Sequence, residues 1–153
     1  MADNASDETS PAELSQNPAE LSQNPAELSE KEWRERLSRE QFYVLRDKGT
    51  ERPFSGQYAH PEFDGTFRCA GCGAVLFSSE DQFDSGSGWP SFARPVDSDA
   101  VVLSADRSLF VRRIEVTCKA CGGHLGHLFR DGPNPTGERW CINSVSLRLD
   151  DRA

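Results

Sequence analysis

The chain has 153 residues, which suits one domain with a tail and leaves too little length for two full domains. Hydrophobic residues make up 36% of the sequence, and no apolar run approaches the roughly 18 residues of a membrane span. The formal net charge of -8 argues against nucleic acid as the main partner. The first residues contain neither a basic start nor an apolar stretch, so we predict no secretory signal and expect a cytoplasmic protein.

The acidity is concentrated in residues 1–30, which contain seven acidic residues and no Lys or Arg. Residues 10–30 repeat one heptapeptide three times, as SPAELSQ, NPAELSQ and NPAELSE. Each copy begins with the helix-start pattern of an N-cap residue, Pro and an acid, but the next Pro interrupts the helix too early for stability. We therefore predict that residues 1–28 form a disordered acidic tail and residues 29–153 the domain. A docking function for the tail is the alternative.

Two short helices are expected where the tail ends. Ser29-x-x-Glu32 and Ser38-x-x-Gln41 are capping-box patterns, which predict helices over 31–37 and 39–48. Gly49 is expected to end the second helix. The expected buried anchors of this region are Trp33, Phe42, Tyr43 and Leu45.

After Gly56 the sequence favours strands. Short runs rich in β-forming residues alternate with clusters of Gly, Pro and Asp, which predicts an antiparallel all-β domain without βαβ units. The expected strands lie at residues 74–78, 101–104, 109–116, 124–129 and 141–149.

Four of the five cysteines form two matched C-x-x-C-G motifs. Each motif supplies two sulfurs from one tight turn, so together they offer the four thiolates of a tetrahedral metal site. The glycine that follows each second cysteine suits a position with positive φ. Zinc is the expected metal, iron is also compatible with the sequence, and a pair of redox-active dithiols is the alternative. The motifs are Cys69-Ala-Gly-Cys72-Gly73 and Cys118-Lys-Ala-Cys121-Gly122.

Cys141 is the one cysteine outside these motifs. In a regular strand, Arg139, Cys141 and Asn143 share an inward face with the apolar positions 145, 147 and 149. The opposite face, which carries Ser144 and Ser146, is expected to be solvated. A guanidinium on the face of Cys141 favours the reactive thiolate. An inert cysteine that packs as a small hydrophobe is the alternative.

Two further polar clusters carry candidate site residues. A regular strand would direct His124 and His127 to opposite faces, but a bulge at Gly126 would bring them to the same side. Both could bind metal, although four cysteines already complete a tetrahedron. Trp89 in the segment GSGWPSF, residues 86–92, is either a core residue or an exposed recognition surface. The third histidine, His60, is expected in a loop.

Together these motifs resemble the B-type methionine sulfoxide reductases, over about residues 37–149. The matching segments are KGTERPFSG at 48–56, CAGCG at 69–73, GSGWPSF at 86–92, CKACGGHLGHLF at 118–129, DGP at 131–133 and RWCINSVSL at 139–147. The resemblance implies two antiparallel sheets, which we expect in a barrel-like arrangement with short N-terminal helices. It also implies a structural zinc on Cys69, Cys72, Cys118 and Cys121, and reduction of the R epimer of methionine sulfoxide.

The resemblance also implies roles at individual positions. Cys141 corresponds to the nucleophile, which would attack the sulfoxide sulfur and become a sulfenic acid. Trp89 corresponds to the indole that packs against the substrate methyl group. An imidazole would protonate the departing oxygen, and polar side chains would donate hydrogen bonds to it. Five further residues match positions that surround the sulfoxide or organise the site: His124, His127, Asn143, Arg139 and Asp131.

One position departs from the pattern of many family members. Where they carry a second, resolving cysteine, this sequence has Ser87. Because the other four cysteines are expected to bind the metal, Cys141 has no internal partner for a disulfide. An external thiol must then reduce its sulfenic acid. The family implies thioredoxin, which would attack Cys141 directly unless a glutaredoxin or a small thiol acts first.

A zinc-ribbon binding module without catalysis is the second hypothesis for this chain. The cysteine motifs and the expected β fold suit it equally well. It leaves Cys141 and the two neighbouring histidines without a role, so we favour the enzyme. We expect a monomer that acts on oxidised proteins or peptides and has no nucleic-acid or membrane partner.

Overall fold

The computed structural model describes residues 24–106 and 113–151 of the chain. Most of the predicted tail, residues 1–23, lies outside the described residues. Within the third repeat, the side chain of Asn24 accepts a hydrogen bond from the backbone N–H of Ala26 at 3.0 Å and caps η2 (Pro25–Glu27). The helix-start pattern of this repeat therefore produces a single 3-10 turn.

Two seven-residue helices follow, α2 (Glu30–Arg36) and α3 (Arg39–Leu45), and both begin with the predicted capping box. The hydroxyl groups of Ser29 and Ser38 each accept a hydrogen bond from the backbone N–H three residues later, at 3.1 Å. The side chain of that third residue accepts one in return, so two unpaired helix donors are satisfied at each start. None of the helices in the described part of the chain has the length and apolar character needed to span a membrane.

α3 ends three residues before the predicted end. The chain turns beyond it with Lys48 in the left-handed region, at φ 60°. Gly49 donates its N–H to the carbonyl of Tyr43 at 2.8 Å, and a side chain at position 49 would overlap the Tyr43 ring. Tyr43 itself is 52% exposed, so the prediction that it is buried was wrong, because only one stripe of this helix faces the core. The other three predicted anchors are buried: Trp33, Phe42 and Leu45.

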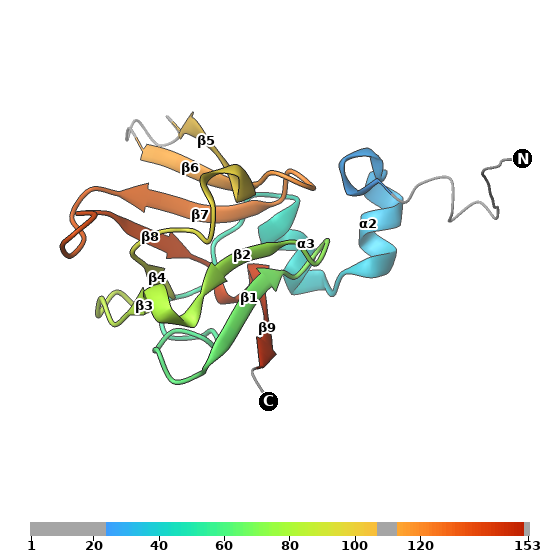
Figure 1. Cartoon of the computed structure of the whole chain (residues 1–153). Helices are drawn as coiled ribbons and strands as arrows, with labels where there is room; N and C mark the ends of the chain where they lie inside the picture. Colours follow the sequence, from blue (N-terminus) through green and yellow to red (C-terminus); the bar gives the residue numbers. More distant parts are fainter. Residues whose placement is uncertain (1–23, 107–112, 152–153) are drawn as a thin grey trace, which may run out of the picture.

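The strands form two antiparallel sheets, as predicted (Figure 1). The three-stranded sheet has the order β2 (Val75–Ser78), β1 (Gly65–Cys69), β9 (Leu147–Asp151). The six-stranded sheet has the order β3 (Gln82–Phe83), β4 (Ser91–Phe92), β8 (Arg139–Ile142), β7 (His124–Phe129), β6 (Arg113–Cys118), β5 (Val101–Asp106). Short 3-10 turns lie at η3 (Ser79–Asp81), η4 (Ser98–Ala100) and η6 (Ser144–Ser146). Neither sheet closes on itself within the described residues, so the expected barrel-like arrangement is not confirmed.

Most of the predicted strands are present. β7 has the predicted bounds, and β2 and β5 contain most of the runs at 74–78 and 101–104. The predicted strand at 109–116 begins outside the described residues, and β6 covers its end. β1, β3 and β4 were not predicted, and β3 and β4 have only two residues each.

The predicted strand at 141–149 is instead two strands, β8 and β9, separated by η6. Ser144 and Ser146 in this turn are 4% and 0% exposed, so the expectation of a solvated face was wrong. The hydroxyl of Ser144 accepts a hydrogen bond from the Tyr58 N–H at 3.1 Å, and that of Ser146 donates to the His124 carbonyl at 3.0 Å. These bonds compensate for the burial of both hydroxyls.

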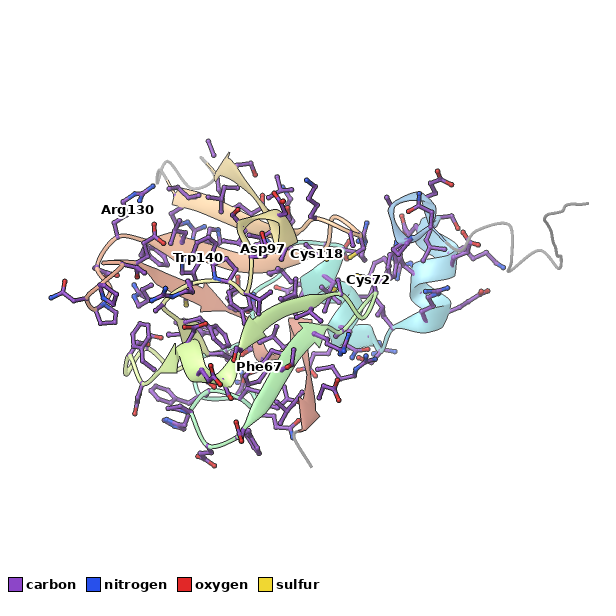
Figure 2. The ribbon with its side chains drawn as sticks, in the orientation of Figure 1. Phe67, Cys72, Asp97, Cys118, Arg130 and Trp140 are labelled. Atoms are coloured by element: carbon purple, nitrogen blue, oxygen red, sulfur yellow. The ribbon has the colours of Figure 1, made fainter. Side chains whose placement is uncertain are left out.

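An aromatic core joins the two sheets. Phe77 of β2 stacks on Phe92 of β4 with ring centroids 4.4 Å apart, and Phe67 of β1 meets Phe92 edge-on at 5.3 Å. Trp140 of β8 meets Phe77 edge-on, with ring centroids 6.4 Å apart. Figure 2 labels Trp140 and Phe67, which lie on different sheets. This core fixes which face of β8 is buried, and therefore which face carries the site.

Candidate active site and metal centre

Cys141 lies on β8 and lines a cavity of about 250 Å³. Along this strand Trp140 and Ile142 are buried in the core, while Arg139 and Cys141 alternate with them and are only partly buried. The inward face predicted for Cys141 is therefore the wall of a cavity and not the core. Five of the seven predicted non-metal site residues line it: Cys141, His127, Asn143, Trp89 and Arg139.

Arg139 is held firmly at one side of this cavity. Its Nε and Nη2 donate to the two carboxylate oxygens of Asp131 at 2.9 and 3.2 Å. The guanidinium also stacks over the ring of Phe129 at 4.4 Å. Asp131 is mostly exposed and lies outside the cavity lining, and Arg139 holds the pKa of its carboxyl group below the usual range. Asp131 thus fixes the direction of the cation beside Cys141.

Trp89 forms another wall. Its indole lines the cavity and is partly exposed. Of the two roles expected for Trp89, a recognition surface therefore fits better than a core residue. The indole Nε1 donates a hydrogen bond to the backbone carbonyl of Glu51 at 3.0 Å. The preceding Gly88 has φ 96° and its carbonyl accepts from the N–H of Phe54 at 2.7 Å, where a side chain would meet Pro53 and Phe54. Trp89 is therefore held against the segment that contains Glu51.

The two histidines of β7 are on the same side of the sheet, as the predicted bulge requires. Val116 of β6 pairs with Gly126, whereas Thr117 pairs with His124, so β7 contains one extra residue between them. The imidazole rings of His124 and His127 are 5.4 Å apart as a result. Position 126 must be glycine, because a side chain there would overlap the carbonyl group of Cys141 on β8.

Only one of these histidines reaches the cavity. His127 lines it, and its Nε2 lies 2.8 Å from a carboxylate oxygen of Asp106 on β5. His124 is 4% exposed behind His127, and its Nδ1 lies 2.8 Å from the buried carboxylate of Glu115. Burial lowers the pKa of His124, although Glu115 partly opposes this effect. The His124 ring meets the His127 ring edge-on, with centroids 5.4 Å apart, and does not line the cavity.

Two acids that the sequence analysis did not select thus hold the histidines. Asp106 ends β5 and Glu115 lies in the middle of β6, between the apolar residues Ile114 and Val116. A charged residue in an apolar strand is itself a signal, since burial of a carboxylate requires a partner.

Glu51 is a third acid that was missed. It is 6% exposed, and its carboxylate accepts hydrogen bonds from the backbone N–H groups of Ser144 and Val145, both at 2.9 Å. Burial raises its pKa, although these hydrogen bonds oppose the shift. Its own N–H donates to the Asn143 side-chain oxygen at 3.0 Å. The segment KGTERPFSG that carries the family resemblance contains Glu51, which was the available signal.

Asn143 closes the same network. Its side-chain Nδ2 donates to the carbonyl of Leu125 on β7 at 2.9 Å, while its oxygen accepts from the Glu51 N–H. The residue is 3% exposed, although it contributes to the cavity lining. The amide therefore ties three segments together at the end of β8, where Cys141 is located.

The surroundings of Cys141 act on the pKa of its thiol in opposite directions. Burial raises its pKa above the ordinary value, while the charge of Arg139 and hydrogen bonding by Ser87 lower it. The expected effect of Arg139 on the thiolate is present, but burial outweighs it, and the negative charge of Glu51 adds to the rise.

The four remaining cysteines converge at one point. Their sulfur atoms all lie within 4.8 Å of one another, with 3.7 Å between Cys69 and Cys121 and 3.6 Å between Cys72 and Cys118. A tetrahedral metal with bonds of about 2.3 Å to sulfur separates its ligands by about 3.8 Å, so the cluster fits such an ion. This convergence of both motifs favours a metal site over two independent dithiols.

The two cysteine motifs form nearly identical turns. Gly73 and Gly122 have φ 85° and 77°, as predicted, and each donates its N–H to the carbonyl of the first cysteine of its motif. Backbone N–H groups also point at the sulfur atoms, at 3.4 Å for Cys69 and 3.3 Å for Cys121, which favours thiolates. One turn joins β1 to β2 and the other joins β6 to β7, so an ion bound by all four cysteines would link the two sheets (Figure 2, Cys72 and Cys118).

Comparison with known proteins agrees with this geometry. The model of the SelR domain family matches residues 37–151. Two proteins from Methanosarcina barkeri and Methanosarcina mazei, both named peptide methionine sulfoxide reductase MsrB, are each 57% identical to the chain, over 120 and 118 residues. These matches cover 78% and 77% of this chain and 84% of either relative. A protein of the same name from Bradyrhizobium diazoefficiens is 55% identical over 123 residues, which cover 80% of this chain and 88% of the relative. The chain therefore belongs to the SelR-domain family of B-type peptide methionine sulfoxide reductases.

Proposed function

We propose that this protein is a thiol-dependent oxidoreductase that reduces methionine-R-sulfoxide in oxidised proteins or peptides to methionine, with Cys141 as the nucleophile. The observation that carries the proposal is the position of this cysteine. Of the five cysteines, Cys141 alone is outside the four-sulfur cluster, and it opens on a cavity bounded by Trp89 and His127. The relatives at 55–57% identity are named for the same reaction.

The chemistry uses these residues as follows. The sulfur of Cys141 attacks the sulfoxide sulfur, and His127, which lines the cavity, protonates the departing oxygen. His124 supports His127 from behind, and Asn143 positions the end of β8. Overall the sulfoxide S–O bond breaks and one oxygen atom ends on the sulfur of Cys141. The sulfoxide thereby gains two electrons and becomes a thioether, while Cys141 loses two electrons and becomes a sulfenic acid.

Trp89 and Arg139 bind and orient the substrate in this proposal. The indole of Trp89 offers an apolar surface for the methyl group next to the sulfoxide. Arg139, oriented by Asp131, places a positive charge beside the reacting sulfur and so favours the thiolate. Both walls are fixed before substrate arrives, which reduces the cost of ordering them.

An external thiol must complete the cycle. It attacks the sulfenic acid of Cys141, releases water and leaves a mixed disulfide, which a second thiol reduces to regenerate Cys141. Ser87 lines the cavity, and it stands at the position that the family resemblance assigns to a resolving cysteine. Thioredoxin is the proposed donor, with a glutaredoxin or a small thiol as the alternative. A cytoplasmic location and a monomeric state remain predictions.

We further propose that the four-cysteine cluster holds one structural zinc ion. Cys69, Cys72, Cys118 and Cys121 would be its ligands, and the ion would supply folding energy without taking part in redox chemistry. The separation of the chain into a tail of residues 1–28 and a domain of residues 29–153, and the barrel-like arrangement of the sheets, remain predictions.

The test is a turnover assay with a peptide that contains racemic methionine sulfoxide, in the presence of dithiothreitol. We expect consumption to stop at about half of the substrate, because only the R epimer reacts. Cys141→Ser should be inactive while it retains its metal. A wild-type protein that consumes no sulfoxide would instead support the zinc-ribbon binding module.

A further inference from the structure

The cavity at Cys141 contains a second cation that the proposed reaction does not use. Arg113 of β6 lines this cavity together with Arg139, and none of the described residues in the lining is acidic. The acids that pair with the two arginines, Asp106 and Asp131, lie outside the lining. A methionine sulfoxide side chain has no net charge, so the sulfoxide alone does not account for a cavity with two positive charges.

Strand register places Arg113 on the face of the sheet that carries the reacting residues. Glu115 of β6 stands opposite His127 of β7, and Arg113 is two residues earlier on β6, so its side chain points to the same side. Cys141 of β8 stands opposite His127 in turn. Arg113 is therefore one alternate position, about 7 Å along the strand, away from the row that contains the nucleophile.

The two arginines lie on either side of Phe129. This residue of β7 stands opposite Arg139, whose guanidinium is 4.4 Å from the centroid of its ring. Toward β6, the pairing of Ile114 with Leu128 brings Arg113 beside Phe129, because the register is antiparallel. Phe129 also lines the cavity. Next to the reacting row, the cavity is therefore bounded by an aromatic ring with a guanidinium on each neighbouring strand.

The two guanidinium groups differ in how they are held. Arg139 donates two hydrogen bonds to Asp131. Among the described residues, Arg113 makes one ion pair, in which its Nη2 lies 3.5 Å from a carboxylate oxygen of Asp106. That same oxygen lies 2.8 Å from Nε2 of His127. The Nε of Arg113 is buried and has no hydrogen-bond partner in the part of the chain that the structure describes. Arg113 thus has hydrogen-bonding capacity left for a ligand.

We propose that Arg113 is a specificity-determining residue that binds a substrate carboxylate close to the methionine sulfoxide. This carboxylate is either the α-carboxylate of a C-terminal methionine sulfoxide or the side chain of an acidic residue next to it. A guanidinium matches the two oxygens of a carboxylate, and partial burial strengthens their attraction. Arg113 takes no part in breaking the S–O bond, and the proposal rests on the proposed function of the same cavity.

The dimensions of the substrate agree with this role. The α-carboxyl carbon of methionine sulfoxide lies four bonds from the sulfur, about 5 Å away when the side chain is extended. This span is close to the step of about 7 Å between the reacting row and Arg113. A substrate with its sulfur at Cys141 can therefore reach the guanidinium with a carboxylate on the same residue or on the next one.

The test measures kcat/KM, with dithiothreitol as reductant, on two matched pairs of short peptides that contain methionine-R-sulfoxide. In the first pair the sulfoxide residue is the last one and ends in a free carboxylate or an amide. In the second pair it is followed by aspartate or asparagine, and both peptides end in an amide. For at least one pair we expect kcat/KM of the wild type to be about tenfold higher on the charged peptide, mainly through a lower KM, as one charge-assisted hydrogen bond would give. The pair that shows the difference identifies the source of the carboxylate.

Arg113→Gln removes the charge, and the ratio of kcat/KM within the matched pair should fall to about one. The ratio is the readout because any disturbance of Asp106 or His127 affects the charged and the neutral peptide alike. Arg113→Met, which keeps the apolar stem, should lose the preference as well, whereas Arg113→Lys should retain part of it. Arg130→Gln is the matched control, since it removes an exposed arginine outside the cavity and should keep the wild-type ratio.

The possible failures are distinguishable. Equal kcat/KM on the charged and neutral peptides in the wild type would overturn the proposal and leave the proposed reductase function intact. A preference that survives in both Arg113→Gln and Arg113→Met would also overturn it and would assign the carboxylate to Arg139. A wild type that reduces none of the four peptides would refute the proposed function and, with it, this role of Arg113.

Discussion

Cys141 of β8 and His127 of β7 stand directly opposite each other in the six-stranded sheet. Side chains at such positions share one face, with Cβ atoms about 4.5–5.5 Å apart. The bulge beside Gly126 allows this arrangement without removing His124 from the same side. Strand register therefore brings together the proposed nucleophile and its proposed acid, although a loop separates the two strands in the sequence.

Replacing the imidazole of His127 should lower the rate of the chemical step. For His127→Asn we expect kcat to fall by about 10²–10⁴-fold, the usual contribution of a positioned general acid. Substrate binding should change less, so the loss should appear in kcat more than in KM. His60→Asn removes an exposed imidazole outside the cavity and should retain full activity. Equal losses in both variants would argue against a specific role for His127.

Removing the charge of Arg139 should raise the pKa of Cys141. The cation favours the thiolate, so Arg139→Met lowers the thiolate fraction at any given pH. The midpoint of the pH profile for alkylation of Cys141 by iodoacetamide should therefore move upward. Arg139→Lys keeps the charge and should shift the midpoint less, although it loses the paired contact with Asp131. A midpoint that stays constant in Arg139→Met would show that the guanidinium does not act on the sulfur.

Truncation of Glu51 should destabilise the whole domain. Glu51→Ala leaves the buried N–H groups of Ser144 and Val145 without acceptors, and we expect a loss of about 2–4 kcal/mol in the free energy of unfolding measured with urea. Glu62→Ala removes an exposed carboxylate from a loop and serves as the control, with an expected change within about 0.5 kcal/mol. A loss below 1 kcal/mol in Glu51→Ala would show that these two hydrogen bonds contribute little to the stability of the domain.

The metal centre makes a stoichiometric prediction. Elemental analysis should find one zinc per chain, and Cys72→Ser should lose the ion together with much of its thermal stability, because binding energy is folding energy at such sites. Cys141→Ser changes a cysteine outside the cluster and should keep both the zinc and the melting temperature. Wild-type protein without stoichiometric metal would refute the assignment.

Two deletions examine the predicted tail. Removal of residues 1–23 should leave activity and melting temperature nearly unchanged, because this segment contains no aromatic residue and is strongly acidic. Removal of residues 1–28 also deletes Leu28, which packs against the core, and should cost a few degrees. A large loss from the first deletion would show that the repeats bind the domain.

The features that the sequence predicted best are governed by local chemistry. The capping boxes at Ser29 and Ser38 and the two cysteine turns depend on residues at most five positions apart. The bulge of β7 was also predictable, since two histidines at odd spacing around a glycine needed one. The geometry of each of these features is determined by residues close together in the sequence and depends little on the rest of the chain.

The features that were missed depend on distant partners. The Glu51 carboxylate accepts hydrogen bonds from N–H groups more than 90 residues away, and the residues near Glu51 in the sequence do not indicate these partners. The hydroxyls of Ser144 and Ser146 were expected in solvent because alternation was extended through a turn that interrupts the strand. His124 matched a polar site position, but its burial behind His127 depends on Glu115 from the neighbouring strand.

The hydrogen bonds from Ser144 and Val145 to Glu51 also determine when the site can form during folding. The segment with Glu51 supports Trp89 and is anchored on the turn after β8, so the cavity walls meet only after a loop of more than 90 residues has closed. Contacts of such high sequence separation form late, because chain entropy opposes them until the intervening structure exists. During synthesis, a chain whose β8 has not yet left the ribosome can already have formed most of its hairpins and still lack the cavity. Recovery of activity during refolding should therefore follow the slowest structural phase and not the formation of the sheets.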